Sequence, residues 1–517
     1  MNWSIPMPCG KMMCEFTENK DTHTAVYTDM SADAAEAYFE TLKKANFICR
    51  ETKNSDASRF AAFDDGTTCV FVNFYFATSE LTVVAETNSR YFDFSDVSGK
   101  PVVKPQITQI ALEDFGLSYA IRLADGRFII FDGGWENEPD ADKLMNCLKR
   151  GTPHDKPVIA AWIMTHPHVD HYRCFIIFMQ KYASDVVVEK MLYTFPGLEE
   201  IETGKGYAIG EKGLNDGGVA AGLPRFFEEV KKLGVPVYAP HSGQHYGIGE
   251  ASLDILSSPD DDVYRHGQDG YDLNCNSLVI RMRLAGQTIL WCADAQFDAM
   301  RITARYGNAL KADILQVPHH GFGGGTIESY KFIKPEVCFI PVSDQNCYLD
   351  FCRMIESSHY LMRDAGIGEL IAGSNERTIT LPYHAPWYAA RDLEEKVMFG
   401  EKSRGSKCWY FSDEYTGNPE DMRFTITSLE RRPVNVTADI CCENGANSVG
   451  GIKIPIEKTV TRVDFLTREG ISLEASKYNR SPLYKKGLPE NDLCTIRFLS
   501  DKPIIVSQKN HADAYHV

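Results

Sequence analysis

The stretch from Met164 to His171, MTHPHVDH, constrains the fold of this chain more than any other feature. It holds three histidines and an aspartate within a few residues, although only 14 of the 517 residues are histidine. It directly follows PVIAAWIM, an apolar run typical of a buried strand. Imidazole and carboxylate groups are the mixed nitrogen and oxygen ligands that cations such as Zn²⁺ favour. The stretch therefore predicts a fold in which a buried strand leads into a metal-ligating loop.

Three other polar sites share this placement at the end of a predicted strand. They are Asp132 after RFIIF, Asp294 after TILWCA, and His319-His320 after DILQVP. The strands alternate with helix-like segments such as DADKLMNCLKR and CFIIFMQKY, which indicates a layered α/β domain. Polar groups at the carboxyl ends of strands in such a layer converge on one edge of the sheet. We therefore expect at least three imidazoles and two carboxylates at one locus.

The spacing within the histidine stretch favours two ions. His166 and His168 are two residues apart and can face one ion, whereas Asp170 and His171 are adjacent and can serve a second. Two neighbouring ions need a bridging anion, and the lone carboxylate of Asp294 suits that role.

Each distant site has a simpler interpretation when taken alone. Asp132 could be a turn residue in DGG, Asp294 could cap the predicted helix AQFDAMRITARYG, and His319-His320 could form an ordinary turn. The matching contexts after predicted strands favour the shared metal site.

These motifs resemble those of the metallo-β-lactamase fold hydrolases. THPHVDH resembles the signature of that superfamily, FDGG its aspartate-bearing first motif, and CADA the motif of its bridging aspartate. The run from NCNSLVIRMRLAGQTILWCADA to LKADILQVPHHG is most similar to the branch typified by the ComEC/Rec2 competence-protein domain. The resemblance covers about residues 106–385 and implies an αββα sandwich with a two-metal site at one sheet edge. The cluster motif says little about the substrate.

The resemblance also implies a role for each candidate residue. The first metal would be held by His166 and His168, and the second by Asp170, His171 and one histidine of the later pair, with Asp294 bridging. Similarity to esterases of this branch favours His320 as the ligand and His319 as a substrate-facing donor or acid, with the opposite assignment left open. Asp132 would orient a ligating imidazole or the metal-bound water. Asp170, Asp132 and His319 are thus the candidate catalytic residues.

One region departs from the family pattern. Many members supply a further histidine to the first metal just before the strand that leads to the bridging aspartate, but here the segment reads DLNCNS. Asn274 could ligate there or contact the substrate, and Asn276 lies beside it. His241 and His245, in APHSGQHYGIG, could fill the gap, although an ordinary loop between two strands is the simpler interpretation.

The expected function is hydrolysis by a metal-bridging hydroxide, and the expected substrate is a small molecule or other phosphoester with a phosphodiester or phosphoester bond. Two divalent ions are expected, with zinc favoured and manganese or iron as alternatives. Alternative hypotheses are a lactam or thioester hydrolase of the same fold, and a non-catalytic metal-stabilised binding protein. A flavodiiron-type redox role would need more carboxylate ligands than the sequence offers. The chain has no Gly-x-Ser-x-Gly elbow, and GFGGG lacks the Lys-Ser/Thr of a phosphate loop.

The flanking regions predict two further domains. Residues 1–100 read as a small α+β domain, with a helix after Ser31 and a hairpin at Asp65-Gly66. Residues 405–517 read as a β-sandwich-like accessory domain for binding or assembly, through which the chain could oligomerise. The Gly-rich segment 203–224 is a candidate flap over the site.

Charge and composition exclude some partners. The 71 acidic and 54 basic residues give a net charge of −17, which disfavours direct binding to nucleic acid or to anionic membranes. No apolar run approaches the roughly 18–20 residues of a membrane-spanning helix, and no signal-peptide pattern is visible. The 15 cysteines form no C-x-x-C pair, which is typical of reduced thiols. We therefore expect a cytoplasmic protein.

Overall fold

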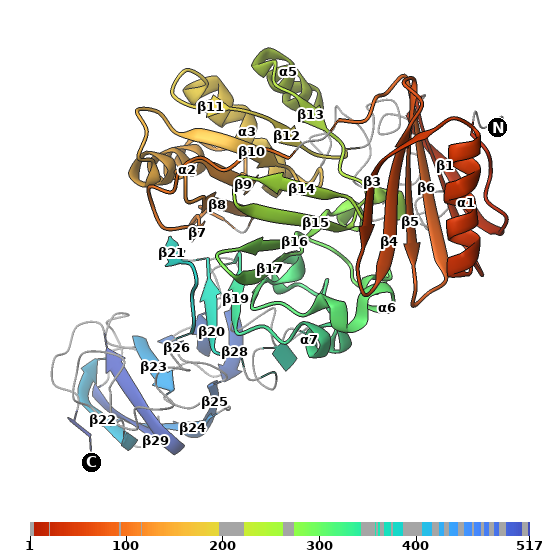
Figure 1. Cartoon of the computed structure of the whole chain (residues 1–517). Helices are drawn as coiled ribbons and strands as arrows, with labels where there is room; N and C mark the ends of the chain where they lie inside the picture. Colours follow the sequence, from red (N-terminus) through yellow and green to blue (C-terminus); the bar gives the residue numbers. More distant parts are fainter. Residues whose placement is uncertain are drawn as a thin grey trace. The chain divides into compact units, whose positions relative to one another are not determined.

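The computed structural model describes residues 5–19, 21–92, 95–114, 116–195, 222–261, 273–342, 357, 360, 361, 365, 367–373 and 376–385, and the C-terminal strands given below. The chain divides into two compact units (Figure 1). The first comprises Met1–Val342 and Ile371–His384, and the second comprises Ser343–Leu370 and Ala385–Val517. Among the described residues, no helix has both the length and the apolar character needed to span a membrane.

The first unit begins with an antiparallel six-stranded sheet covered on one face by a helix (Figure 1). In spatial order its strands are β1 (Lys11–Asn19), β2 (Thr22–Thr28), β6 (Glu80–Thr87), β5 (Thr68–Tyr75), β4 (Ser58–Asp64) and β3 (Ile48–Asn54). The helix is α1 (Ala32–Lys44), and Ser31 caps it by accepting a hydrogen bond from the Ala34 amide. The hairpin at Asp65-Gly66 joins β4 to β5, with Gly66 at a φ of 91°. Both sequence predictions for this region, the cap and the hairpin, are confirmed.

A second, eight-stranded sheet carries the histidine stretch. Its main path is β13 (Val237–Tyr238), β12 (Met191–Leu192), β10 (Val158–Ile163), β9 (Phe128–Asp132), β8 (Ser118–Arg122), β7 (Gln106–Gln109) and β21 (Arg377–Thr380), and β11 (Val187–Val188) pairs with β10. The helices of this region are α2 (Glu138–Gly151), α3 (Val169–Tyr182) and α5 (Leu223–Leu233). Residues 203–221 of the candidate flap lie outside the described residues, and its last residues lead into α5.

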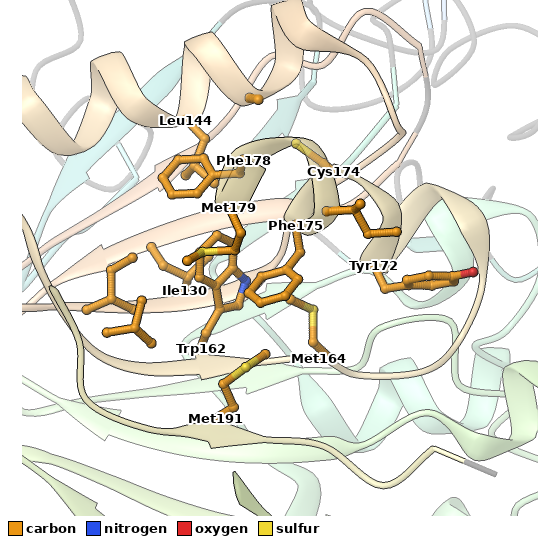
Figure 2. Packing of buried hydrophobic residues seen from close by; sticks show 14 of the residues in the cluster. Ile130, Leu144, Trp162, Met164, Tyr172, Cys174, Phe175, Phe178, Met179 and Met191 are labelled. Carbon is orange, nitrogen blue, oxygen red and sulfur yellow. The ribbon is translucent and has the colours of Figure 1, made fainter. Parts of the chain in front are cut away.

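A dense apolar core fixes the histidine stretch at both ends (Figure 2). Trp162 of β10 packs edge-on against Phe175 and Phe178 of α3, with ring centroids 4.9 and 5.1 Å apart. Leu144 of α2 and Met191 of β12 belong to the same buried cluster. Because the stretch lies between β10 and α3, this packing holds its two ends in place.

A third, seven-stranded sheet carries the other candidate ligands. Its order is β14 (His245–Ile248), β15 (Ala251–Ser257), β16 (Val279–Leu284), β17 (Gln287–Trp291), β18 (Ile314–Gln316), β19 (Val337–Ile340) and β20 (Glu369–Ala372). The helices α6 (Ile302–Tyr306) and α7 (Ile327–Ile333) lie between its strands in sequence. The prediction of a helix over AQFDAMRITARYG is wrong for its first part, because α6 begins only at Ile302, after Arg301 takes a left-handed φ of 56°.

Aromatic side chains fill the space between the second and third sheets. Phe131 of β9 stacks on Trp291 of β17 with centroids 4.6 Å apart, and Tyr119 of β8 contacts both Trp291 and Phe339 of β19. The two sheets therefore pack face to face. The mixed α/β class with several sheets is confirmed, and this packing is compatible with a sandwich.

The six-stranded sheet joins the third sheet through buried polar contacts. Arg305 of α6 donates to Glu80 of β6 at 3.0 Å, and Thr82 of the same strand donates to Asp261 at 2.8 Å. Tyr75 of β5 also donates to Asp261, at 2.5 Å. The first three sheets thus belong to one compact unit. The division into domains at 1–100, 106–385 and 405–517 stays a prediction.

The second unit is rich in β-structure. Its strands are β22 (Ser406–Tyr415), β23 (Arg423–Ser428), β24 (Val434–Cys442), β25 (Val449–Ile456), β26 (Val460–Leu466), β27 (Gly470–Glu474), β28 (Arg480–Tyr484), β29 (Leu493–Gln508) and β30 (Tyr515–His516). They join into one nine-stranded hydrogen-bonded sheet. β29 pairs with β24 through its first half and with β23 through its second half.

Candidate metal centre

The candidate ligands lie at strand ends, as the sequence predicts. His166 and His168 occupy the loop after β10, and Asp170 and His171 lie in the first turn of α3. Asp294 follows β17. His320 follows β18, and Asp132 is the last residue of β9. The fold brings residues from both facing sheets to one place.

The first group of potential ligands contains Asp170, His171, Asp294 and His320, whose ligand atoms all lie within 4.8 Å of one another. The His320 Nε2 atom is 3.1 Å from Asp170 Oδ2 and 3.2 Å from Asp294 Oδ2. The His171 Nε2 atom is 3.3 Å from the same Asp294 oxygen. All four residues are buried. Two imidazoles and two carboxylates thus converge on one point.

The second group contains His166, His168 and Asp294. The His166 Nε2 atom is 3.9 Å from Asp294 Oδ2, and the rings of His166 and His171 are 4.1 Å apart. Asp294 is the one residue that belongs to both groups. Its position between them is the position that a bridging carboxylate would occupy.

Three buried atoms of the cluster lack a hydrogen-bond partner among the described residues. They are His166 Nε2, His171 Nε2 and Asp294 Oδ1. An unsatisfied buried polar atom costs about 1–3 kcal/mol, so such atoms are rare unless something binds them. Lone pairs of nitrogen and oxygen that converge in this way fit divalent metal ions.

Charge coupling sets the protonation states within the cluster. Burial, together with neighbouring histidines, lowers the pKa of His166 well below its usual range, so this imidazole is neutral. Burial would also lower the pKa of His320, but Asp294 and Asp170 outweigh it and raise this pKa to about 9. The same balance raises the pKa of His171, through Asp294, Asp170 and Asp132. The carboxylates therefore favour positive charge at this point, which a divalent cation would supply on binding.

Asp132 fixes the orientation of His171. Its Oδ2 atom accepts hydrogen bonds from His171 Nδ1 at 2.7 Å and from the Thr165 hydroxyl at 2.6 Å. Its Oδ1 atom accepts from the Thr165 amide at 2.7 Å, and its carbonyl accepts from Trp162 Nε1 at 2.9 Å. Because a carboxylate only accepts, the proton lies on His171 Nδ1 and the Nε2 atom faces the cluster.

The two histidines after β18 occupy different environments. His320 is buried and belongs to the four-residue group, whereas His319 has 26% of its side chain exposed and belongs to neither group. The His319 Nδ1 atom lies 3.0 Å from Gln296 Nε2, and its Nε2 atom lies 3.9 Å from Asp294 Oδ2. The geometry thus favours His320 over His319 as a ligand.

The asparagine segment lies beside the histidine stretch, and the ligand or substrate role of Asn274 stays a prediction. Asn274 and Asn276 are buried in a short 3-10 helix, Leu273–Asn276, and the amide of Leu278 donates to the Thr165 carbonyl at 3.1 Å.

His241 and His245 do not fill the gap at the first metal. His241 lies 3.0 Å from Asp260 and 3.3 Å from Glu86 of the six-stranded sheet. His245 lies 2.9 Å from Asp254. Both imidazoles therefore face carboxylates outside the ligand groups. The contact of His241 with Glu86 depends on how the sheets pack, whereas His245 faces Asp254 across the β14–β15 hairpin.

The sequence prediction missed several supporting residues. Gln296 contacts His319, Gln316 bonds the backbone before Asp294, and Ser277 accepts a hydrogen bond from the Asp294 amide at 3.2 Å. Amide and hydroxyl side chains are common in loops and carry no distinctive spacing. The one available signal was the polar Gln316 at the end of the apolar strand DILQ.

No protein-family model matches this sequence, and no curated protein matches it. Among solved structures, the chain is similar to Anabaena sensory rhodopsin transducer, with 16% identity and a TM-score of 0.16, over 22% of this chain and 93% of that one. It is also similar to the flavodiiron protein from Giardia intestinalis, with 14% identity and a TM-score of 0.22. That match covers 38% of this chain and 42% of the flavodiiron chain, less than half its length. Likenesses this distant carry no argument, so the functional reasoning rests on the cluster itself.

Proposed function

We propose that this chain is a two-metal hydrolase of the metallo-β-lactamase superfamily that acts on phosphodiester or phosphoester bonds. One observation carries the proposal: the buried carboxylate of Asp294 lies in two ligand groups at once. The motifs THPHVDH, CADA and HHG supply these groups, and FDGG supplies Asp132, which orients His171, in the order that the superfamily resemblance implies.

The ligand assignment follows the two groups. His166, His168 and Asp294 would hold one ion, and Asp170, His171, Asp294 and His320 would hold the other. The mixture of imidazole and carboxylate favours zinc, with manganese or iron as alternatives. The second group, with His166, His168 and Asp294, offers three protein ligands among the described residues, which would leave coordination positions open to a substrate oxygen.

When bound, the ions would supply a water that is activated near neutral pH and would stabilise negative charge on the substrate. The protein supplies orientation and a proton donor. Gln296 Nε2 also lies 3.4 Å from the Asp294 carbonyl, which only accepts, so this amide nitrogen is the donor and His319 Nδ1 the acceptor. A His319 ring that accepts at Nδ1 carries its proton on Nε2, from which it can be donated to a substrate oxygen. A tetrahedral phosphoryl group suits a site with two cations and an N–H donor.

Metal analysis combined with turnover of bis-p-nitrophenyl phosphate tests the proposal. We expect two metal equivalents per chain, and a loss of turnover in His166→Ala that exceeds the ~10–100-fold typical of losing a partner outside the ligand set. His154→Ala is the matched control, because the His154 ring bonds the Asp125 carbonyl rather than the cluster. Metal binding without hydrolysis of any phosphoester, lactam or thioester would contradict the proposal. Hydrolysis of lactams or thioesters alone would overturn the substrate class.

A further inference from the structure

The ends of β17 and β18 carry Asp294 and His320, and the spacing of these residues depends on two sharply turning loops. The strands run parallel, with Ile289 opposite Ile314. Beyond them, Ala293 takes a φ of 47° and His319 a φ of 49°, both left-handed. One backbone hydrogen bond joins the two loops directly, from the His319 amide to the Ala293 carbonyl at 2.9 Å, and the regular ladder does not continue, so other backbone groups there need other partners.

One buried side chain supplies those partners. The Gln316 Oε1 atom accepts hydrogen bonds from the amides of Cys292 at 2.8 Å and Ala293 at 2.6 Å. Its Nε2 atom donates to the carbonyls of Ala293 at 3.1 Å and Val317 at 2.7 Å. The four bonds go to backbone within three residues of Asp294 or His320, and Gln316 is 1% exposed.

We propose that Gln316 is a positioning residue that sets the spacing between Asp294 and His320, and hence the geometry of the four-ligand metal site. This inference rests on the proposed function. A primary amide offers both acceptor and donor atoms, so it can satisfy two N–H groups and two carbonyls together. Glutamate has no N–H donors, and methionine, of similar length, has neither the N–H donors nor the amide oxygen.

The two metal groups depend on Gln316 to different degrees. In the four-residue group, Asp294 and His320 both lie on the loops that Gln316 bonds. In the other group only Asp294 does, because His166 and His168 follow β10 of the second sheet. A change at Gln316 should therefore weaken the four-residue site more than the other site.

Cobalt(II) titration of the metal-free full-length protein, followed by calorimetry and visible absorption, tests this inference. In Gln316→Met and Gln316→Glu we expect the four-residue site to lose ~10–100-fold in affinity, with a smaller loss at the other site. The control is Gln244→Met, since buried Gln244 also accepts a backbone hydrogen bond, from His241, but lies outside the ligand groups. The control should bind cobalt like the wild type.

Wild-type affinities at both sites in the Gln316 variants would overturn the inference. Equal losses at the two sites would overturn it as well. Unfolding of both variants while Gln244→Met stays folded would show that Gln316 serves the fold rather than the metal spacing. Wild-type protein that binds two cobalt ions but hydrolyses nothing would contradict the proposed function and leave the Gln316 comparison intact.

Discussion

Asp132→Asn should weaken metal binding, although Asp132 is not itself one of the candidate metal ligands. The carboxylate of Asp132 is buried and accepts hydrogen bonds on both oxygens, from Thr165 and from His171. In the variant, one oxygen becomes an NH₂ group, which can only donate. If the NH₂ group replaces Oδ1, it faces the Thr165 amide, and two donors meet with no acceptor between them. If it replaces Oδ2, it faces the His171 Nδ1–H group, which is also a donor.

The second arrangement can be relieved by a change of tautomer. His171 would then carry its proton on Nε2, the atom that faces Asp294 at 3.3 Å, and would no longer offer a lone pair to a metal. The first arrangement leaves a buried amide unsatisfied, which costs about 1–3 kcal/mol. We therefore expect unfolding free energy to fall by about 1–3 kcal/mol and metal affinity to fall by ~10–100-fold.

Calorimetric metal titration and urea unfolding would measure the two effects. Asp140→Asn is the matched control, because Asp140 is also buried and accepts bonds from the Glu113 amide at 2.8 Å and from Asn137 at 2.7 Å. It should lose stability and keep its metal affinity. Wild-type metal affinity in Asp132→Asn would refute the reasoning.

Three further outcomes follow from the structure. Burial alone would lower the pKa of His241, but its two carboxylate partners raise it to about 10. Since this pKa exceeds the unfolded value of 6.5, the stabilisation by His241 is complete below pH 6.5 and is lost as the pH rises through 10. Urea unfolding should therefore show that the unfolding free energy falls less steeply between pH 6.5 and 10 in His241→Gln than in the wild type. Arg305→Met leaves buried Glu80 with Arg301 as its remaining arginine partner and should lower the unfolding free energy by about 1–3 kcal/mol, measured by the same method, whereas an unchanged midpoint would contradict this ion pair's role. His319→Ala should keep both metals and lose turnover by ~10²–10⁴-fold, whereas His320→Ala should lose a metal equivalent. Metal analysis and turnover measure these outcomes, and the reverse pattern would make His319 the ligand and His320 the proton donor.

The sequence located the cluster because its residues carry their chemistry in their side chains. His166, Asp294 and His320 each follow an apolar strand, and the carboxyl ends of such strands meet in an α/β layer. Their roles as ligands stay predictions. Gln316 and Gln296 were missed because an amide's role depends on which backbone groups the fold places around it.

The fold was predictable where the local pattern was strong. The helices α2 and α3 and the meander of β4, β5 and β6 lie where periodicity and turn residues indicated. The helix after Asp294 was wrong in its first part because left-handed backbone at Arg301 delays its start. The contact of His241 with Glu86 was out of reach, since Glu86 comes from a sheet more than a hundred residues earlier in the chain.

The number of metal ions bound by variants of single ligands tests the shared-carboxylate site most directly. We would measure metal equivalents in the wild type and in Asp294→Ala, His168→Ala and His320→Ala after equilibration with zinc. The geometry predicts two equivalents for the wild type, about one for each histidine variant and none held tightly by Asp294→Ala, because only Asp294 belongs to both groups. Two equivalents retained in Asp294→Ala, or none in the wild type, would contradict the two-metal centre.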